Sequence, residues 1–136
     1  MSPQQITLVQ QSFTRVVPIA ETAAALFYER LFILDPSVKS LFSGDMKQQG
    51  HMLMQAIGLA VKGLHQPESI LPTLQALGKR HKQYGVRTEH YTTVGAALLW
   101  TLEQGLGEAF TPEVKDAWQA AYMLLASAMQ EAAAVV

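Results

Sequence analysis

The chain has 136 residues, 49% of them hydrophobic, and its 10 Lys and Arg against 11 Asp and Glu give a formal net charge of −1. This length predicts one domain, residues 1–136, that buries about 70% of its unfolded surface and can enclose a cavity. The near-neutral charge favours neither nucleic acid nor an anionic membrane as a partner, and the absence of cysteine excludes disulfides, thiolate zinc sites and iron–sulfur clusters.

The N-terminus and the apolar stretches give no sign of export or membrane insertion. The first eleven residues lack a cationic region followed by an apolar run, and residues 56–61, among the most apolar, are far shorter than a membrane span. We therefore expect a cytoplasmic protein.

The first quarter of the chain predicts two helices separated by a proline. Ser2, Pro3 and Gln5 form an N-cap, a first-turn proline and a capping-box partner, and the helix that they open ends or kinks at Pro18. Residues 19–34 then form a helix whose buried side holds Ala24, Phe27, Tyr28 and Leu31. Tyr28 is thus a core tyrosine whose hydroxyl needs a partner.

Two further helices follow. Asp35 and Pro36 start a short one over residues 36–42, bracketed by Phe32 and Phe42 and ended by residues 43–45. Residues 46–64 form a longer helix with a polar stripe of Gln48, His51, Gln55, Gly58 and Lys62, so we assign His51 to solvent. Gln49 differs, because its own stripe continues as Leu53, Ala56, Ala60 and Leu64 and places one amide at the end of a buried face.

Residues 70–91 carry the most informative pattern. As a helix, this stretch places Ile70, Leu74, Leu77, His81 and Tyr84 on one stripe, so an imidazole lies on an apolar side. A buried ring needs a partner, which a backbone carbonyl or Tyr84 could provide in a purely structural role. Pro67 precedes the helix, Pro72 fits only a first turn or a kink, and Gly85 ends the helix.

The last two helices open at Thr88 and at Thr111-Pro112-Glu113. The first has Tyr91, Val94, Leu98 and Leu102 on one side and ends near Gly105 and Gly107; the second has an apolar stripe of Val114, Trp118, Ala121, Leu125 and Met129. No segment alternates with period 2 for long enough to be a strand. We therefore predict an all-α fold.

The polar residues on buried helix faces limit the kinds of functional site that the chain can form. The four histidines show no i, i+4 pair, and the chain has no phosphate loop, GxSxG elbow or dinucleotide fingerprint. What remains is Tyr28, Gln49 and His81. One metal ligand opposed by hydrogen-bonding groups suits a cofactor that brings its own equatorial ligands, namely haem.

Six short stretches follow one another along the chain with near-fixed spacing: LFYERLF (26–32), PSVKSLF (36–42), the spacing of Gln49 and Leu53 with MQAIG after it, LGKRHKQYGV (77–86), HYTTVGAALL (90–99) and AWQAAY (117–122). Through these stretches the chain resembles the single-domain bacterial globins that are similar to the globin domain of flavohaemoglobins. The resemblance extends from Ile6 to about Met129, and the stretch LGKRHKQYGV looks especially close to thermophile and acidophile relatives.

The resemblance implies a globin fold around haem b and a role for each matching residue. His81 would be the proximal iron ligand, and its second ring nitrogen would donate to the carbonyl of Leu77. Tyr28 and Gln49 would be the distal polar pair that stabilises bound oxygen. Phe42 would wedge against the ring, Leu53 would form the distal apolar wall, and Arg80 would pair a propionate; Leu77 and Tyr91 complete the expected cofactor contacts.

The residues also allow simpler interpretations. Phe42 fits plain core packing, and Leu53 is core in either case. Gln49 lies at a helix end, where its side chain can turn to solvent. Arg80 belongs to a basic run with Lys79 and Lys82 that is by default a solvated face.

The chain departs from the flavohaemoglobin pattern late in the last helix. The glutamate that binds the proximal histidine there corresponds to Ala133, and Glu131 is two residues early, about 200° around a helix. We also see no flavin or nicotinamide domain in the sequence, so we expect electrons to come from a separate reductase.

We therefore expect a haem globin, a monomer or weak homo-oligomer, that binds oxygen, nitric oxide and carbon monoxide reversibly. Oxygen storage or transport and nitric oxide dioxygenation with a separate reductase are the expected functions. The alternative is a helical sensor or interaction module, cofactor-free or haem-based, because fold does not fix function.

Overall fold

The computed structural model describes residues 1–42 and 44–134. Its α-helices are α1 (Pro3–Val16), α2 (Ala20–Leu34), α3 (Met46–Lys62), α4 (Pro67–Gln83), α5 (Thr88–Leu106) and α6 (Pro112–Ala134), with 3₁₀ turns η1 (Val17–Ile19), η2 (Pro36–Leu41) and η3 (Gly107–Ala109). No described residue lies in a strand, which confirms the all-α prediction.

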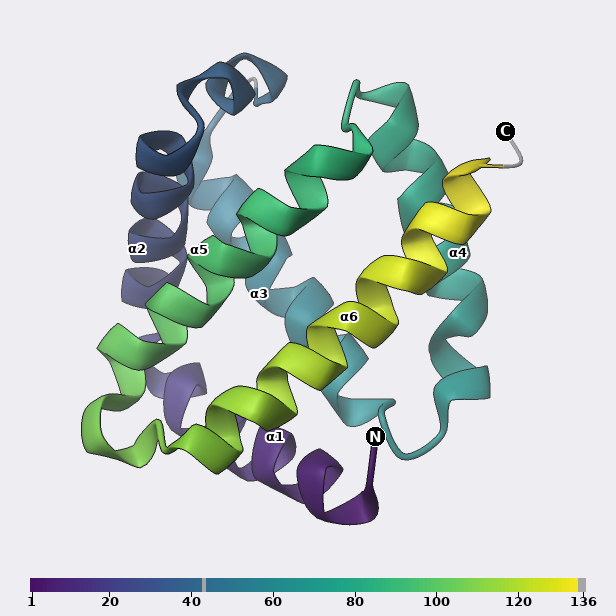
Figure 1. Ribbon diagram of the computed structural model, residues 1–136. Coiled ribbons are helices and arrows are strands. Elements are labelled where there is room, and N and C mark those ends of the chain that lie inside the picture. The colour runs from purple at the N-terminus through teal and green to yellow at the C-terminus, as the bar shows by residue number, and fades with distance from the viewer. Residues whose placement is uncertain (43, 135–136) are drawn as a thin grey trace.

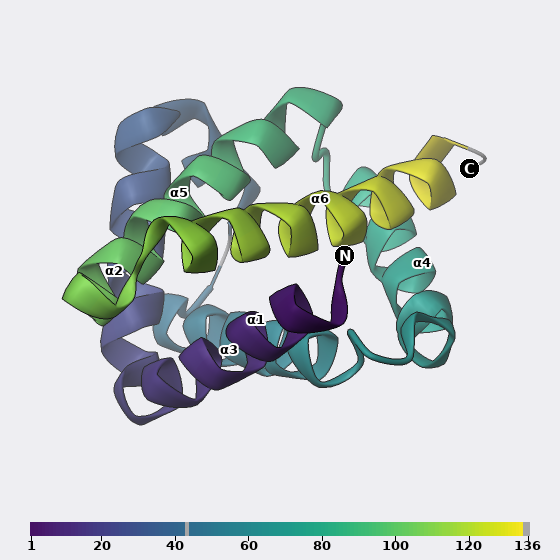
Figure 2. The same ribbon diagram turned by 60° about the horizontal axis from the view of Figure 1, so that its bottom comes forward.

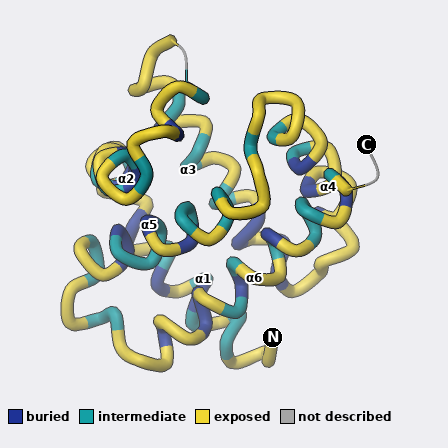
Figure 3. The backbone as a smooth tube through the Cα atoms, turned by 45° about the horizontal axis from the view of Figure 1, so that its top comes forward, coloured by how far each residue is buried: buried dark blue, intermediate teal, exposed yellow. Residues whose placement is uncertain are grey.

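The helices form two layers closed at both ends. α5 and α6 lie over α1 and α3, while α2 and α4 stand at opposite ends of the molecule (Figures 1 and 2). α4 packs mainly on α6, and α2 packs on α5 and α3. Buried segments (dark blue) are spread over several helices, and much of the remaining tube is exposed (yellow) (Figure 3). This arrangement leaves α3 and α4 facing each other without close packing between them.

Local signals set the helix starts. The Ser2 hydroxyl accepts from the Gln5 amide while the Gln5 side chain accepts from the Ser2 amide, which confirms the capping box. Asp35 accepts from the amide of Ser37, and Thr111 accepts from the amide of Val114 at the start of α6. The predicted role of Ser43 in ending the short helix lies outside the described residues.

Two parts of the core hold the layers together. The larger joins α1, α3, α5 and α6, and within it the Trp118 indole N–H donates to the Ser12 hydroxyl over 2.8 Å. The smaller joins α2, η2 and α5 around Phe27, Tyr28 and Leu31. Its aromatic side chains border the candidate site.

The structure corrects two details of the α4 prediction. Tyr84 does not continue the buried stripe: it caps the helix after Gln83 and is 66% exposed, because the chain leaves helical geometry towards Gly85. Pro67, expected before the helix, is its first residue. Pro72 lies inside α4, so of its two expected positions the first turn is excluded, and the carbonyl of Glu68 lacks its usual helical donor.

None of the helices in the described ranges is both long enough and apolar enough to cross a membrane.

Candidate functional site

Tyr28 of α2 provides a buried donor at one side of the site. It is 8% exposed, and its hydroxyl donates to the backbone carbonyl of Gln49 over 3.4 Å. Burial raises the pKa of Tyr28 to about 12, so the hydroxyl stays protonated at neutral pH. A bond of this length is weak, and the proton is therefore available to a better acceptor nearby.

Gln49 and Tyr28 come together, but through an atom that the sequence did not indicate. The acceptor is the backbone carbonyl of Gln49, near the start of α3, and the Gln49 residue as a whole is half-buried. Tyr28 and the backbone of Gln49 are thus neighbours in space, and the role of the two side chains as a distal polar pair stays a prediction.

Aromatic rings surround the Tyr28 side chain. Phe42 meets it edge-on with ring centroids 5.2 Å apart, and Phe32 contacts both Tyr28 and Phe42. Leu53, one turn after Gln49 on α3, packs against the same cluster. These contacts place Phe42 against the Tyr28 ring and Leu53 against the same cluster, so the surroundings of the ring are apolar.

His81 of α4 is held at one ring nitrogen. Its Nδ1 lies 2.6 Å from the carbonyl oxygen of Leu77, one turn earlier, and since a carbonyl only accepts, Nδ1 carries the proton. No described residue bonds Nε2, which leaves this nitrogen as the atom able to bind a metal. The predicted bond to Leu77 is therefore confirmed, and the alternative partner, Tyr84, is exposed instead.

A glycine sets how closely α4 approaches α6. A Cβ added to Gly78 would lie 2.1 Å from the carbonyl oxygen of Met129, so the two backbones touch where the helices cross. Gly78 is three residues before His81. The close approach thus fixes the height of the imidazole relative to α6.

A groove of about 290 Å³ separates α3 from α4. It is lined mostly by apolar side chains: Met52, Ala56, Leu59, Ala60, Ile70, Leu74 and Leu77, joined by Gln55, Thr73 and Arg80. Met52 and Leu59 are about half exposed. Arg80 places a cation on this groove, one residue before His81.

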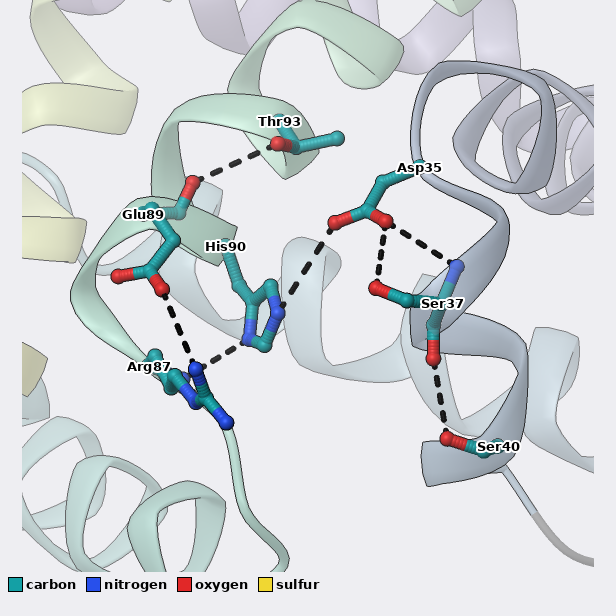
Figure 4. A network of polar contacts seen from close by, with 7 residues as sticks. All are labelled: Asp35, Ser37, Ser40, Arg87, Glu89, His90 and Thr93. Carbon is teal, nitrogen blue, oxygen red and sulfur yellow. Dashed lines mark hydrogen bonds and ion pairs between the residues drawn. The ribbon is translucent and has the colours of Figure 1, made fainter.

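Tyr91 lies near the start of α5, where two sets of contacts hold the helix. The Tyr122 hydroxyl of α6 donates to the carbonyl of Tyr91 over 2.6 Å. On the other side, the Arg87 amide donates to Nδ1 of His90, and Nε2 of His90 lies 4.0 Å from the Asp35 carboxylate (Figure 4). The first turn of α5 is thus tied to α6 and to the α2–η2 corner.

The end of α6 offers His81 no carboxylate in the described structure. Ala133 accepts a hydrogen bond from the Lys82 ammonium through its backbone carbonyl over 3.0 Å, and Glu131 is exposed. The partner recorded for His81 is the neutral carbonyl of Leu77. Among the described residues, no three His, Asp or Glu side chains gather as a metal site.

A protein-family model described as Globin matches residues 25–129, which include every residue of the candidate site. The chain belongs to the globin family. Membership of this family makes haem the cofactor of the chain.

Named relatives agree with this family. The flavohemoprotein of Xylella fastidiosa (strain Temecula1) is 30% identical over 138 residues, covering 99% of this chain and 34% of its own length. The flavohemoprotein of Bordetella parapertussis is 33% identical over 129 residues, covering 93% and 32%. The chain therefore spans about a third of the length of these curated relatives.

Solved structures share the arrangement of helices. An engineered carbene transferase made from a proposed nitric oxide dioxygenase of Rhodothermus marinus has a TM-score of 0.90 at 25% identity, covering 99% of this chain and 94% of the other. A hexacoordinated heme protein from an anhydrobiotic tardigrade also reaches 0.90, at 16% identity and with 98% and 96% covered; this second likeness shows the fold alone.

The residues of this globin fit a haem. A flat apolar ring with an anionic edge needs an axial nitrogen, apolar walls and a cation at the rim. No residue that the structure describes bonds Nε2 of His81, the groove between α3 and α4 has a largely apolar lining, and Arg80 lies at that groove.

Sequence reasoning missed Tyr122 and Gly78 as supports of the globin site. Tyr122 holds the carbonyl of Tyr91 from 31 residues away, and its ring fills the space above Gly95. Gly78 could have been noticed as a small residue beside a histidine. Its contact with Met129, however, depends on how two distant helices cross.

Proposed function

We propose that this globin binds oxygen and other diatomic ligands reversibly at a haem held by His81, and that it converts nitric oxide to nitrate when an electron donor is present. The proposal rests on the protonation and hydrogen bonding of two side chains, His81 and Tyr28. His81 donates through Nδ1 and keeps Nε2 for iron, while Tyr28 is a buried, protonated donor. Haem supplies the iron that binds the ligand and that is oxidised to the ferric state when oxygen and nitric oxide become nitrate.

Several side chains would hold the cofactor. The carbonyl of Leu77 fixes the imidazole of His81 in one tautomer and orientation. The Arg80 guanidinium would pair with a carboxylate at the edge of the ring. Leu53 and Phe42 would exclude water from the side where the ligand binds. Leu77 of α4 and Tyr91 of α5 would contact the haem ring.

Tyr28 would stabilise oxygen more than carbon monoxide. Oxygen held at a haem would carry more negative charge than carbon monoxide, so the hydroxyl would exchange its weak 3.4 Å bond to Gln49 for a stronger one. A charge-assisted hydrogen bond is worth about 1.5–3 kcal/mol, or roughly ten- to 150-fold in the dissociation rate. The Gln49 amide, half-buried at the start of α3, is the second donor that we propose.

Nitric oxide dioxygenation requires oxygen to be held and the ferric iron to be reduced again. Tyr28 serves the first requirement. His81 has a neutral carbonyl partner, so it donates less charge to the iron than a histidine paired with a carboxylate, and peroxidase-like bond cleavage should be weak. The homology to flavohemoproteins and the likeness to the Rhodothermus marinus protein support the reaction.

The absorption spectrum of the purified protein, with and without carbon monoxide, tests haem binding. We expect a haem spectrum that changes on adding carbon monoxide, and a protein with no such spectrum would be the cofactor-free module instead. His81→Gly should lose the spectrum until imidazole is added. An unchanged spectrum in His81→Gly without imidazole would show that another residue binds the iron.

Stopped-flow mixing of the oxygenated protein with nitric oxide tests the reaction. We expect one rapid turnover that yields one nitrate per haem, and repeated turnover only after an NADH-dependent flavoprotein reductase is added. Slow oxidation would favour oxygen storage or sensing. Tyr28→Phe should release oxygen at least about tenfold faster and carbon monoxide less so; equal acceleration of both would mean that Tyr28 acts through its size.

A further inference from the structure

The charges of the chain are unevenly distributed along the sequence. Residues 69–88 contain four of the ten cations, Lys79, Arg80, Lys82 and Arg87, and none of the eleven acids. This stretch therefore carries +4, whereas the rest of the chain carries −5. A protein of net charge −1 thus has one strongly positive segment, which we call the basic segment (residues 79–87).

The basic segment is on the surface. Lys79, Arg80, Lys82 and Arg87 are all exposed, and the intervening Tyr84 is 66% exposed. Lys82 donates to the carbonyl of Ala133 at the end of α6. Arg87 lies 3.8 Å from Glu89, and since both side chains are mostly exposed, this pair neutralises only part of the segment.

The basic segment also contains the residue that we propose binds the iron. His81 lies within it, and Arg80 lines the groove between α3 and α4. An electron that enters here therefore has a short path to the iron through the helix that holds it. In Figure 1 this end of α4 is beside the end of α6, away from α1 and α2.

Helix stability explains part of this charge. Arg80, His81 and Lys82 occupy the last turn of α4, where cations offset the helix dipole by about 0.3–1 kcal/mol each at low ionic strength. That effect does not require Lys79 or Arg87, because both lie outside the last turn. It also gives no reason for the lack of acids over twenty residues.

We propose that the basic segment is the docking surface for an acidic one-electron donor protein, a flavoprotein with a negatively charged surface around its flavin. This inference rests on the proposed function and names the partner of that site. One electron passes from the donor's flavin hydroquinone to the ferric iron, which becomes ferrous, and the flavin is left as the semiquinone.

Charge, exposure and size favour an acidic protein over other polyanions. Four cations neutralise too few phosphates for strong nucleic-acid binding, since 6–10 such contacts are typical of tight complexes. Transient redox complexes bury little surface and depend on electrostatic steering. The exposed Tyr84 lies between Arg80 and Arg87 in the sequence, and tyrosine and arginine are the residue types that interfaces favour.

Two charge reversals separate local from general effects. Lys79→Glu changes the basic segment at a residue that we place neither in the haem pocket nor in its supports. Lys62→Glu makes the same change at an exposed lysine that ends α3. That end of α3 meets α4 at Ile70, which lies against Gly63. Ile70 is about 14 Å from Lys79 along α4, and this separation exceeds the Debye length of about 10 Å at 0.1 M salt.

The first measurement is binding. Backbone amide shifts of the ferrous, carbon-monoxide-bound holoprotein are recorded during titration with oxidised flavodoxin at 20 and 300 mM salt. We expect shifts in the second half of α4 and up to Glu89, with affinity lowered about tenfold by Lys79→Glu, less than twofold by Lys62→Glu, and strongly by salt. Shifts centred elsewhere, or equal effects of the two variants, would overturn the proposal.

The second measurement is the rate of iron reduction. Reduction by flavodoxin hydroquinone should slow about fivefold to tenfold in Lys79→Glu, while reduction by photoreduced riboflavin, a small flavin with no phosphate and no protein surface to dock, should change far less. Binding to phosphatidylserine vesicles that depends on Lys79, without binding to flavodoxin, would assign the segment to membranes and overturn the proposal. If haem binds and nitric oxide is consumed while these shifts are absent, the docking proposal fails and the proposed function stands.

Discussion

A single methyl group added at Gly78 should separate α4 from α6. The new Cβ would lie 2.1 Å from the Met129 carbonyl oxygen, whereas ordinary contacts begin at 3.4 Å, so the helices must part by about 1.3 Å. The obstructing atoms are backbone and cannot rotate away. We expect Gly78→Ala to lose about 1–3 kcal/mol of unfolding free energy, the usual cost of overpacking, or roughly 3–5 °C in Tm per kcal/mol.

Gly58→Ala is the matched control. Its Cβ would lie 3.5 Å from the Phe13 ring of α1, an ordinary van der Waals contact, so the alanine should stabilise α3 by about 0.5–1 kcal/mol. Urea unfolding of both variants measures the difference. In the haem-loaded protein, the iron–histidine vibration should shift in Gly78→Ala and not in Gly58→Ala. Equal stability and equal vibrational frequencies in the two variants would refute the close approach of α4 and α6.

Three further changes test the buried and acidic groups. Burial raises the pKa of Tyr28 to about 12 from the usual 10, so its contribution to stability is complete below pH 10 and is lost as pH rises to 12. In urea unfolding between pH 10 and 12 the protein should therefore lose roughly 1–2 kcal/mol of unfolding free energy, and Tyr28→Phe should lose less. The Ser37 hydroxyl, which donates to Asp35, lowers the pKa of that carboxyl below its usual 3.8; stability is therefore lost as pH falls below 3.8, and Asp35→Asn should flatten the acid limb of the stability curve. Ser12→Ala should cost about 1–3 kcal/mol in urea unfolding by leaving the buried Trp118 N–H without its acceptor, and an unchanged midpoint would contradict that bond.

Local hydrogen bonding explains why the helix starts could be predicted. The patterns at Ser2, Asp35 and Thr111 act within three residues, so the sequence alone contains both partners. The bond between His81 and Leu77 is of the same kind, because residues four apart on a helix are neighbours. The fold class and these contacts are confirmed, while the iron-binding role of His81 stays a prediction.

Contacts between distant helices could not be predicted in the same way. The acceptor of the Tyr28 hydroxyl is a backbone carbonyl 21 residues away, and that of Tyr122 is 31 residues away. Any carbonyl can accept, so residue type gives no signal. The prediction that Tyr84 is buried is wrong. Spacing extends the apolar stripe to a residue that lies beyond the end of the helix at Gln83.

Pro72 divides α4 into two parts with separate attachments. Before it, Ile70 lies against Gly63 at the end of α3; after it, Gly78 lies against Met129 of α6. The missing hydrogen bond at Pro72 weakens the mechanical connection between the parts. The exposed residues 65–69 can therefore accept substitutions or a short insertion, since a displacement of this corner is absorbed at the proline before it reaches His81.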